Sequence, residues 1–371
     1  MASNGHGPLR IAQVAPLHES VPPRLYGGTE RIVSYLTEQL VDAGHDVTLF
    51  ASGDSETSAR LVPGCPRALR LADCSDTLAL HLAMVEQVAR RANEFDFVHF
   101  HIDYLHFPVS RRERYGHVTT LHGRLDLPDL RPVFARFADI PVVSISDAQR
   151  GPLPDIAWQG TVYHGFPERL YHLETRPGDY LAFLGRISPE KGIARAIEIA
   201  RRAGYRLRVA AKIDRADRDY YTTVVAPLLR LPHVEFLGEI GEHEKQELLG
   251  GALALVFPID WPEPFGMVMA ESLACGTPVI AYRRGSVAEV LDDGVTGVLC
   301  DDLAQAVAAG GRIHELSRAT CRQVFEQRFT AARMTGDYVT IYRRLLEHSH
   351  AARDQADPRG LLHPRDQHAS G

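Results

Sequence analysis

The chain has 371 residues, of which 45% are hydrophobic, and its formal net charge at neutral pH is -6. This length exceeds what one hydrophobic core usually organises, so the sequence predicts two domains. A mildly acidic chain has no overall attraction for nucleic acid or anionic lipid, although a local basic patch can hide beneath that average. Nucleic acid is therefore not expected as a partner.

The cysteines and the N-terminus indicate the cellular compartment. The five cysteines are odd in number and scattered, with no Cys-x-x-Cys spacing, which favours free thiols over disulfides or zinc ligands. Residues 1–10 are polar and lead directly into a strand pattern, without the features of an export signal. No stretch approaches the roughly 18 consecutive apolar residues of a membrane span. The sequence thus predicts a cytoplasmic protein without a transmembrane segment, and it leaves peripheral membrane contact and oligomeric state open.

Short apolar segments alternate with helical patterns through the first part of the chain. The expected strands are 10–15, 46–50, 96–100, 118–121 and 141–145, and the expected helices include 29–43 and 77–92. Such alternation is typical of parallel βαβ units. It predicts an α/β, doubly wound, Rossmann-like domain over residues 1–170.

A second series of the same kind follows a segment without periodicity, Pro167 to Gly178, which is the expected linker. Its expected strands are 180–185, 206–211, 234–237, 253–257 and 279–281, and its expected helices are 192–203, 217–230, 243–249 and 266–275. These predict a second Rossmann-like domain over residues 171–329. A further helical pattern covers 330–347, and the Arg-, Asp-, His- and Pro-rich tail 348–371 is expected to be disordered.

Two positions in the first domain could meet a ligand. Gly27 and Gly28 precede the first expected helix, where backbone can approach a ligand closely and the helix N-terminus favours phosphate. A glycine pair alone is more often a mere turn, and the Gly-x-Gly-x-x-Gly dinucleotide fingerprint is absent. His122 follows the fourth expected strand and is predicted to point into a cleft, because ligands bind at the carboxyl ends of such strands. Further cleft candidates, which could equally be structural, are His101, Asp103, Tyr104 and Ser146.

Arg186 and Lys191 lie at the end of the first strand of the second domain. Arginine offers a fork of donors that suits phosphate oxygens, and lysine adds a compact charge that can reach the same group. Cation pairs are usually solvated, but this pair lies at the edge of the sheet where α/β domains bind ligands. We expect both side chains to contact a phosphate.

The segment 261–278 places two carboxylates, Glu263 and Glu271, eight residues apart across a loop that enters a short helix. Each carboxylate can accept hydrogen bonds from a pair of hydroxyl groups. The backbone amides at the start of this helix favour an anion. The residues that carry these amides are Phe265, Gly266, Met267 and Val268. The segment therefore suits a ligand with a sugar at one end, a ribose at the other and phosphate between.

The pattern Glu-x-Phe-Gly-x-x-x-x-Glu, continuing into Ala-x-Gly-x-Pro, resembles the nucleotide-sugar signature of the retaining glycosyltransferases of family 4. Gly-Arg-x-x-x-x-Lys-Gly at 185–192 is similar to the diphosphate-binding motif of that family. The resemblance covers about residues 10–347. It implies the GT-B fold, in which two Rossmann-like domains face each other across a cleft and the last helix, here 330–347, crosses back to the first domain. The first domain would bind the acceptor and the second the nucleotide sugar.

The resemblance also implies roles for individual residues. Glu263 would bind hydroxyls of the transferred sugar, Glu271 would bind the ribose, and the backbone from Phe265 to Val268 would meet sugar and phosphate. Gly27 and Gly28 would belong to a loop that closes over the diphosphate. Arg186 and Lys191 would bind that diphosphate, and His122 would lie beside the transferred sugar.

The chain departs from the family in two places. Lys212-Ile213-Asp214 stands where many relatives have Gly-Asp-Gly, and His164-Gly165-Phe166-Pro167 replaces the commoner Asn-Gly-Ile-Asp. Base recognition is therefore open, and Lys212 could face either the nucleotide or solvent. Asp217-Arg218-Asp219 formally reads as the Asp-x-Asp metal motif of a different transferase fold, but it lies in a charged helix start and is expected to face solvent.

The function implied is a retaining glycosyltransferase that needs no metal or cofactor. It would move a hexose-type sugar from a nucleoside diphosphate donor, a UDP-sugar first and GDP-mannose next, onto a hydroxylated acceptor whose identity the sequence does not reveal. The catalytic candidates are His122, Glu263, Arg186 and Lys191. With only Asp103 and Asp126 near as nucleophiles, we favour front-face displacement. The alternatives are a sugar phosphorylase, a hexosamine epimerase and a non-catalytic nucleotide-sugar-binding protein.

Overall fold

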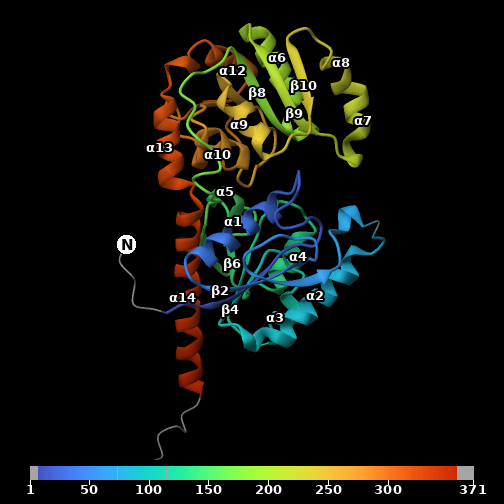
Figure 1. Ribbon diagram of the computed structural model, residues 1–371, viewed down its shortest axis with the longest axis vertical. Helices are drawn as coiled ribbons and strands as arrows, with labels where there is room; N and C mark the ends of the chain where they lie inside the picture. Colours follow the sequence, from blue (N-terminus) through green and yellow to red (C-terminus); the bar gives the residue numbers. More distant parts are fainter. Residues whose placement is uncertain (1–6, 73, 114, 357–371) are drawn as a thin grey trace, which may run out of the picture.

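The computed structural model describes residues 7–72, 74–113 and 115–356. Two parallel sheets form two lobes, with the first domain below the second in Figure 1. The first sheet has seven strands in the order β3-β2-β1-β4-β5-β6-β7, and the second has six in the order β10-β9-β8-β11-β12-β13. The predicted pair of doubly wound α/β domains is confirmed.

The elements have the following bounds. The strands are β1 Arg10–Val14, β2 Asp46–Ser52, β3 Arg60–Cys65, β4 Phe97–Phe100, β5 His117–Thr120, β6 Val142–Ser144, β7 Trp158–Thr161, β8 Tyr180–Arg186, β9 Arg206–Lys212, β10 Val234–Gly238, β11 Ala254–Phe257, β12 Val279–Tyr282 and β13 Gly297–Cys300. The helices are α1 Gly28–Asp42, α2 Thr77–Arg91, α3 Phe107–Ser110, α4 Leu130–Arg136, α5 Asp147–Arg150, α6 Ile193–Ala203, α7 Arg218–Tyr220, α8 Ala226–Leu228, α9 Glu242–Gly250, α10 Met267–Ala274, α11 Val287–Val290, α12 Leu303–Gly310, α13 Arg318–Arg328 and α14 Ala331–Ala356.

The helix expected over 217–230 is interrupted. α7 passes into a π-helical turn, Tyr221–Val225, before α8 begins at Ala226. Pro227 lies in the first turn of α8, and proline has no amide hydrogen to donate to the preceding turn of a helix. A π turn accommodates the missing hydrogen bond, so the segment is helical but is not one regular α-helix.

The last helix belongs structurally to the first domain. In Figure 1, α14 leaves the upper lobe and runs beside the lower one. Tyr338 and Tyr342 are fully buried, and the Tyr342 ring stacks on Phe97 of β4 with 4.7 Å between ring centroids. This helix therefore completes the core of the domain that the first 170 residues begin.

The tail prediction is corrected in part. α14 continues to Ala356, so residues 348–356 are helical where disorder was expected for 348–371. Residues 351–356 include three alanines and no glycine or proline, a composition that favours helix. The rest of that prediction, 357–371, lies outside the described residues. Among the helices that the structure describes, none combines the length and apolarity needed to cross a membrane.

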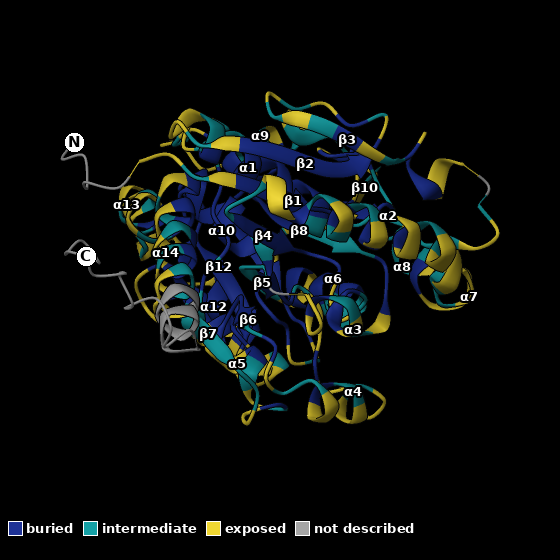
Figure 2. Ribbon diagram, turned by 90° about the horizontal axis from the view of Figure 1, so that it is seen from below, coloured by how far each residue is buried: buried dark blue, intermediate teal, exposed yellow. Residues whose placement is uncertain are grey.

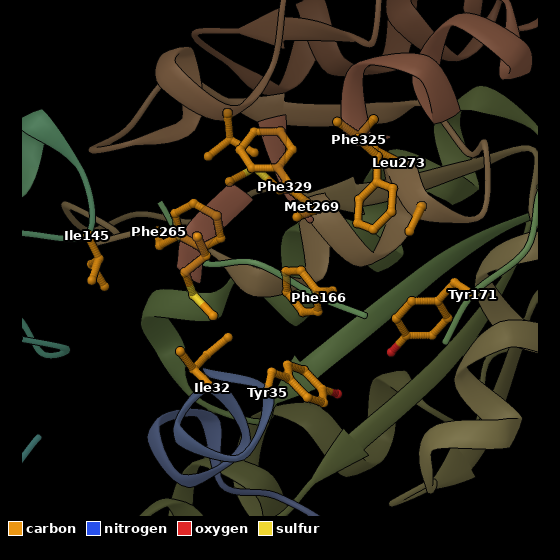
Figure 3. Packing of buried hydrophobic residues seen from close by; sticks show 14 of the residues in the cluster. Ile32, Tyr35, Ile145, Phe166, Tyr171, Phe265, Met269, Leu273, Phe325 and Phe329 are labelled. Carbon is orange, nitrogen blue, oxygen red and sulfur yellow. The ribbon is translucent and has the colours of Figure 1, made fainter. Parts of the chain in front are cut away.

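One apolar cluster joins the two domains. Burial is concentrated in the central strands, whereas the outer faces of the helices are exposed (Figure 2). Figure 3 shows Tyr35 of α1 near Phe166, which follows β7, and Phe265 near Phe329 at the end of α13. The ring centroids of these two pairs lie 5.9 Å and 6.0 Å apart. The cluster is contiguous from α1 to α10 and so fixes the spacing of the two helices whose N-termini carry the predicted donor residues.

Candidate active site

The strand order reverses between β1 and β4 in the first sheet and between β8 and β11 in the second. In open α/β sheets such a reversal leaves a crevice at the carboxyl ends of the strands, where ligands bind. The predicted site residues lie at these ends. Gly27 and Gly28 follow β1, Arg186 ends β8, and Glu263 follows β11.

A pocket between the two domains brings most of the predicted donor residues together. Those that line it are Gly27, Gly28, Arg186, Lys191, Glu263, Gly266, Met267, Val268 and Glu271. Phe265 and His122 line a second pocket instead, which adjoins the first because the two share Tyr26, Gly27, Gly28, Glu263, Gly266 and Met267. The structure thus separates the predicted residues into a donor pocket and a neighbouring pocket that contains His122.

Glu263 is held rigidly at the junction of these pockets. Its backbone carbonyl accepts a hydrogen bond from the amide of Ser286 at 3.0 Å. Gly285 has φ +54°, and a Cβ there would lie 2.4 Å from the backbone of Glu263, so only glycine fits. The carboxylate accepts hydrogen bonds from Lys191 Nζ at 2.5 Å and Trp261 Nε1 at 3.0 Å. The Lys191 ammonium also lies 5.0 Å from the centroid of the Trp261 ring.

Glu271 lies in a network of charges that spans the two domains. Its carboxylate accepts hydrogen bonds from Lys245 Nζ at 2.9 Å and from the Tyr171 hydroxyl at 3.2 Å. Lys245 also contacts Glu242 of α9, which forms an ion pair with Arg31 of α1. Opening the cleft would break the Arg31–Glu242 pair, which is buried on the arginine side. The predicted ribose ligand is thereby connected to the contact that holds the domains together.

Arg186 is surrounded by carboxylates at the end of β8. Its guanidinium lies 2.7 Å from Glu190, 3.5 Å from Asp217 and 3.9 Å from Asp214. The expectation that Asp217 faces solvent is wrong, since only 17% of its side chain is exposed and it lies beside Arg186. The backbone after β9 turns these aspartates toward the cation, and helix-start composition alone does not reveal that turn.

Two helix N-termini meet at the donor pocket. Gly266 precedes α10 with φ +74°, and a Cβ there would approach Met269 Cε to 2.7 Å, so glycine is required. A Cβ on Gly28, the first residue of α1, would lie 3.5 Å from the sulfur of Met267, the first residue of α10. The first residues of both helices, Gly28 of α1 and Met267 and Val268 of α10, line the same pocket, and amides at helix N-termini suit a phosphate.

The donor pocket is lined by five cationic side chains and three carboxylates. The cations are Arg31, Arg186, Lys191, Lys212 and Lys245, and the carboxylates are Glu239, Glu263 and Glu271. Lys212, for which the sequence left two possibilities, faces the pocket, with its ammonium 4.9 Å from the centroid of the Tyr26 ring. Cations thus outnumber carboxylates among the lining residues, although Glu190, Asp214, Asp217 and Glu242 pair with three of these cations from outside the lining. The lining side chains therefore offer donors for a phosphate.

Sequence reasoning missed Arg31 and Lys245. Arg31 lies three residues after Gly28, a spacing that places both on one face of α1, and this was the only available signal. Lys245 carries no motif. Its position in the pocket depends on how α9 packs against α10, and this packing cannot be predicted from a local sequence pattern.

The second pocket is rich in histidine. His122 stacks on His164, with 5.2 Å between ring centroids, and both line this pocket together with His101. Burial lowers the pKa of His122 to about 3, so the ring is neutral near pH 7. Asp103, which is exposed, also lines the pocket and has left-handed backbone with φ +51°.

The other cleft candidates have structural roles. Ser146 caps α5 by accepting a hydrogen bond from the Gln149 amide at 3.1 Å. Tyr104 packs edge-on against Phe134 and lines neither pocket. Both carboxylate oxygens of Asp126 accept hydrogen bonds from the Arg124 guanidinium at 2.7 Å, and Asp126 lines neither pocket.

Comparison with known proteins assigns this architecture. The family described as Glycosyltransferase Family 4 matches residues 26–184, and the family described as Glycosyl transferases group 1 matches residues 172–322. The glycogen synthase of Mycobacterium tuberculosis is 26% identical over 376 residues, which covers 85% of this chain and 89% of that protein. The two family matches together span both Rossmann-like domains.

Solved structures agree with this assignment. AviGT4, a glycosyltransferase involved in avilamycin A biosynthesis, superposes with a TM-score of 0.70 at 24% identity, over 92% of this chain and 99% of that one. HepE of Anabaena in complex with UDP-glucose superposes with a TM-score of 0.63 at 19% identity, over 92% of this chain and 100% of that one. Identities this low show the shared fold alone. With the two family matches, they identify the chain as a family 4 glycosyltransferase with the GT-B fold.

Proposed function

We propose that this glycosyltransferase moves a hexose-type sugar from a nucleoside diphosphate donor to a hydroxylated acceptor, with retention of configuration and without a metal or cofactor. One observation carries the proposal. The pocket that is lined by five cations and two helix N-termini also contains two buried carboxylates, Glu263 and Glu271. We favour a UDP-sugar as donor, with GDP-mannose next, and the solved complex of HepE with UDP-glucose supports the first choice.

The present contacts indicate what donor binding must exchange. The diphosphate would lie between Arg186, Lys191 and the amides of α1 and α10, which draws Lys191 away from Glu263. Glu263 is then free to accept hydrogen bonds from the transferred sugar. The ribose hydroxyls would take the place of Lys245 and Tyr171 on Glu271. Each carboxylate thus exchanges an internal donor for a donor on the substrate, which limits the cost of burying it.

We propose front-face displacement because neither nearby aspartate is well placed as a nucleophile. Asp126 is engaged by Arg124 and lines neither pocket. Asp103 lines the pocket of His122 but not the donor pocket, where the bond between the anomeric carbon and the diphosphate would lie. In this mechanism the bond from the anomeric carbon to the diphosphate breaks, and a bond to the acceptor oxygen forms on the same face. The acceptor proton passes to the leaving diphosphate oxygen, whose charge the surrounding cations stabilise.

The cysteines support a reducing compartment, and we propose the cytoplasm. All five are free thiols in the structure. Burial raises the pKa of Cys275 and of Cys321 to about 12, which keeps these thiols protonated and unreactive. Structural thiols of this kind are usual where disulfides do not form.

Incubation with a panel of nucleotide sugars tests the proposal. We expect slow hydrolysis of a UDP-sugar, release of the sugar as the α-anomer in the first NMR spectra, and loss of both in Arg186→Ala. Hydrolysis of GDP-mannose alone would replace the preferred donor. Turnover only with added phosphate would indicate a phosphorylase. Conversion of the intact nucleotide sugar into its epimer would indicate an epimerase. Binding without turnover would indicate a non-catalytic nucleotide-sugar-binding protein.

Activity is expected to survive removal of divalent metal. The cations and amides of the donor pocket neutralise a diphosphate without an ion, so a metal would be redundant. Initial rates should be the same in EDTA and in magnesium. If EDTA abolishes turnover and magnesium or manganese restores it, the cationic side chains do not suffice and this account of the phosphate site is wrong.

A further inference from the structure

A buried chain of hydrogen bonds runs from His122 to the last helix of the protein. His122 Nε2 lies 2.9 Å from His101 Nδ1, and His101 Nε2 lies 2.8 Å from the side-chain oxygen of Gln13. The amide nitrogen of Gln13 lies 3.3 Å from the hydroxyl of Tyr342 on α14. Gln13 and Tyr342 are fully buried, and His101 is 2% exposed. Water therefore does not compete for these groups.

The proton positions in this chain follow from its partners. The side-chain oxygen of Gln13 can only accept, so the nitrogen that faces it, His101 Nε2, must carry hydrogen. Burial lowers the pKa of His101 well below its usual value, and a neutral imidazole has a single N–H. His101 Nδ1 is then an acceptor, and the nitrogen that faces it, His122 Nε2, must be the donor.

The same direction holds on the other side of Gln13. Its amide donates to the Tyr342 hydroxyl, which is left to donate to His99 Nδ1 at 2.7 Å. His99 Nε2 then donates to Thr120 Oγ1 at 2.8 Å. With the Gln13 amide in this orientation, each donor faces an acceptor along the whole chain.

The other nitrogen of His122 has no partner. Among the described residues, His122 Nδ1 is buried and makes no hydrogen bond, although its ring lines the pocket that adjoins the donor pocket. If Nε2 carries the single proton of this neutral ring, Nδ1 offers a bare lone pair. Because this atom is shielded in the present arrangement, a ligand hydroxyl in the pocket can donate to it only after the ring or a neighbouring side chain shifts.

We propose that His101 is a positioning residue that holds His122 in the tautomer protonated at Nε2. The bare Nδ1 of His122 then accepts a hydrogen bond from a hydroxyl group of the sugar substrate. Gln13 and Tyr342 act further back, by fixing the orientation of His101. The identity of the hydroxyl donor rests on the proposed function, whereas the tautomer does not.

The first experiment reads the tautomer directly and needs no activity. Protein labelled with ¹⁵N-histidine gives long-range ¹H–¹⁵N spectra that distinguish protonated from bare ring nitrogens, and comparison with His122→Gln assigns the His122 signals. We expect a protonated Nε2 and a bare Nδ1. A proton on Nδ1 would overturn the proposal. If no sugar nucleotide is ever turned over, this measurement still stands, so the two proposals fail separately.

The second experiment compares two variants of His101. Leucine removes the acceptor that faces His122, whereas asparagine places its side-chain oxygen near the position of the lost Nδ1. His101→Leu should lower kcat by roughly tenfold to a hundredfold, as is common for groups that orient another residue, with KM for the donor little changed. His101→Asn should restore most of the turnover. Unchanged kcat and unchanged His122 signals in His101→Leu would overturn the proposal.

His106→Leu is the matched control. His106 is as deeply buried and also hydrogen bonded at both ring nitrogens, to Ser110 and Thr119, but it lies outside the chain. An equal loss of kcat in His106→Leu would mean that disturbed packing explains the loss in His101→Leu, and this would overturn the proposal. Should His101→Leu not fold, Tyr342→Phe keeps the ring and removes one hydroxyl. It should then populate the second tautomer of His122, and an unchanged spectrum would count against the chain.

Discussion

Lys191→Ala is expected to lower turnover by about a hundredfold or more. Hydrogen bonds to charged groups contribute about 1.5–3 kcal/mol each, and every 1.4 kcal/mol is about tenfold in rate. The ammonium has two tasks in the structure, since it lines the donor pocket and neutralises Glu263, which is 7% exposed. Its removal therefore takes a charge from the diphosphate and leaves a buried carboxylate without its counterion. Arg186→Ala should show a loss of similar size.

Steady-state kinetics with the identified donor measure this effect, and Arg202→Ala is the control. Arg202 is an exposed cation on α6 that pairs with Glu198 and lines neither pocket. The Arg202→Ala variant should therefore keep full activity. Lys191→Ala with unaltered rate and unaltered donor binding would remove this lysine from the site.

Glu271→Ala and Glu263→Ala are expected to separate nucleotide binding from sugar transfer. Glu271 lies on α10 beside Lys245 and Tyr171, where a ribose would replace these partners, so its loss should weaken binding of the free nucleoside diphosphate by roughly 1.5–3 kcal/mol. Glu263 faces the junction of the two pockets and should contact only the transferred sugar. Its loss should leave binding of the free nucleotide almost unchanged and lower transfer by an order of magnitude or more.

Calorimetry with the free nucleotide and kinetics with the full donor test both halves, and each variant serves as the control for the other. Both substitutions remove a buried carboxylate that is paired with a lysine, so a general effect of losing buried charge would appear equally in the two. Equal weakening of nucleotide binding by Glu263→Ala and Glu271→Ala would contradict the assignment of sugar to one and ribose to the other.

The three strands that the sequence did not predict are all edge strands. β3 contains Pro63 and Gly64, β7 contains Gly160, and β13 directly follows a turn at Gly294. An edge strand pairs on one side only, so it tolerates proline and glycine, which a central strand excludes. β13 is buried throughout, but it has only four residues and begins with Gly297, so its apolar run is short. The central strands are buried on both faces and were predicted because their apolar runs are nearly continuous.

The candidate site was predictable where a local motif carries the chemistry. Glu263, Gly266 and Glu271 lie within nine consecutive residues, so the sequence alone gives their spacing. Arg31 and Lys245 lie on two helices in different domains. Both contact Glu242, and they do so only because α1 packs against the second domain. The sequence places Gln13 in an expected strand and gives no sign of a further role. Its orientation toward His101 depends on Tyr342, which lies more than 300 residues away in the chain.

The crossing of α14 limits how this enzyme can be recombined. A chimaera that takes its first 170 residues from a relative would retain a final helix whose Tyr338 and Tyr342 were shaped for a different sheet. Phe97 would lose its stacking partner or meet a poor one, and the hydroxyl that faces His99 and Gln13 would no longer be matched. Exchange of the first domain therefore requires two cuts, so that the segment from Ala331 travels with the domain it completes.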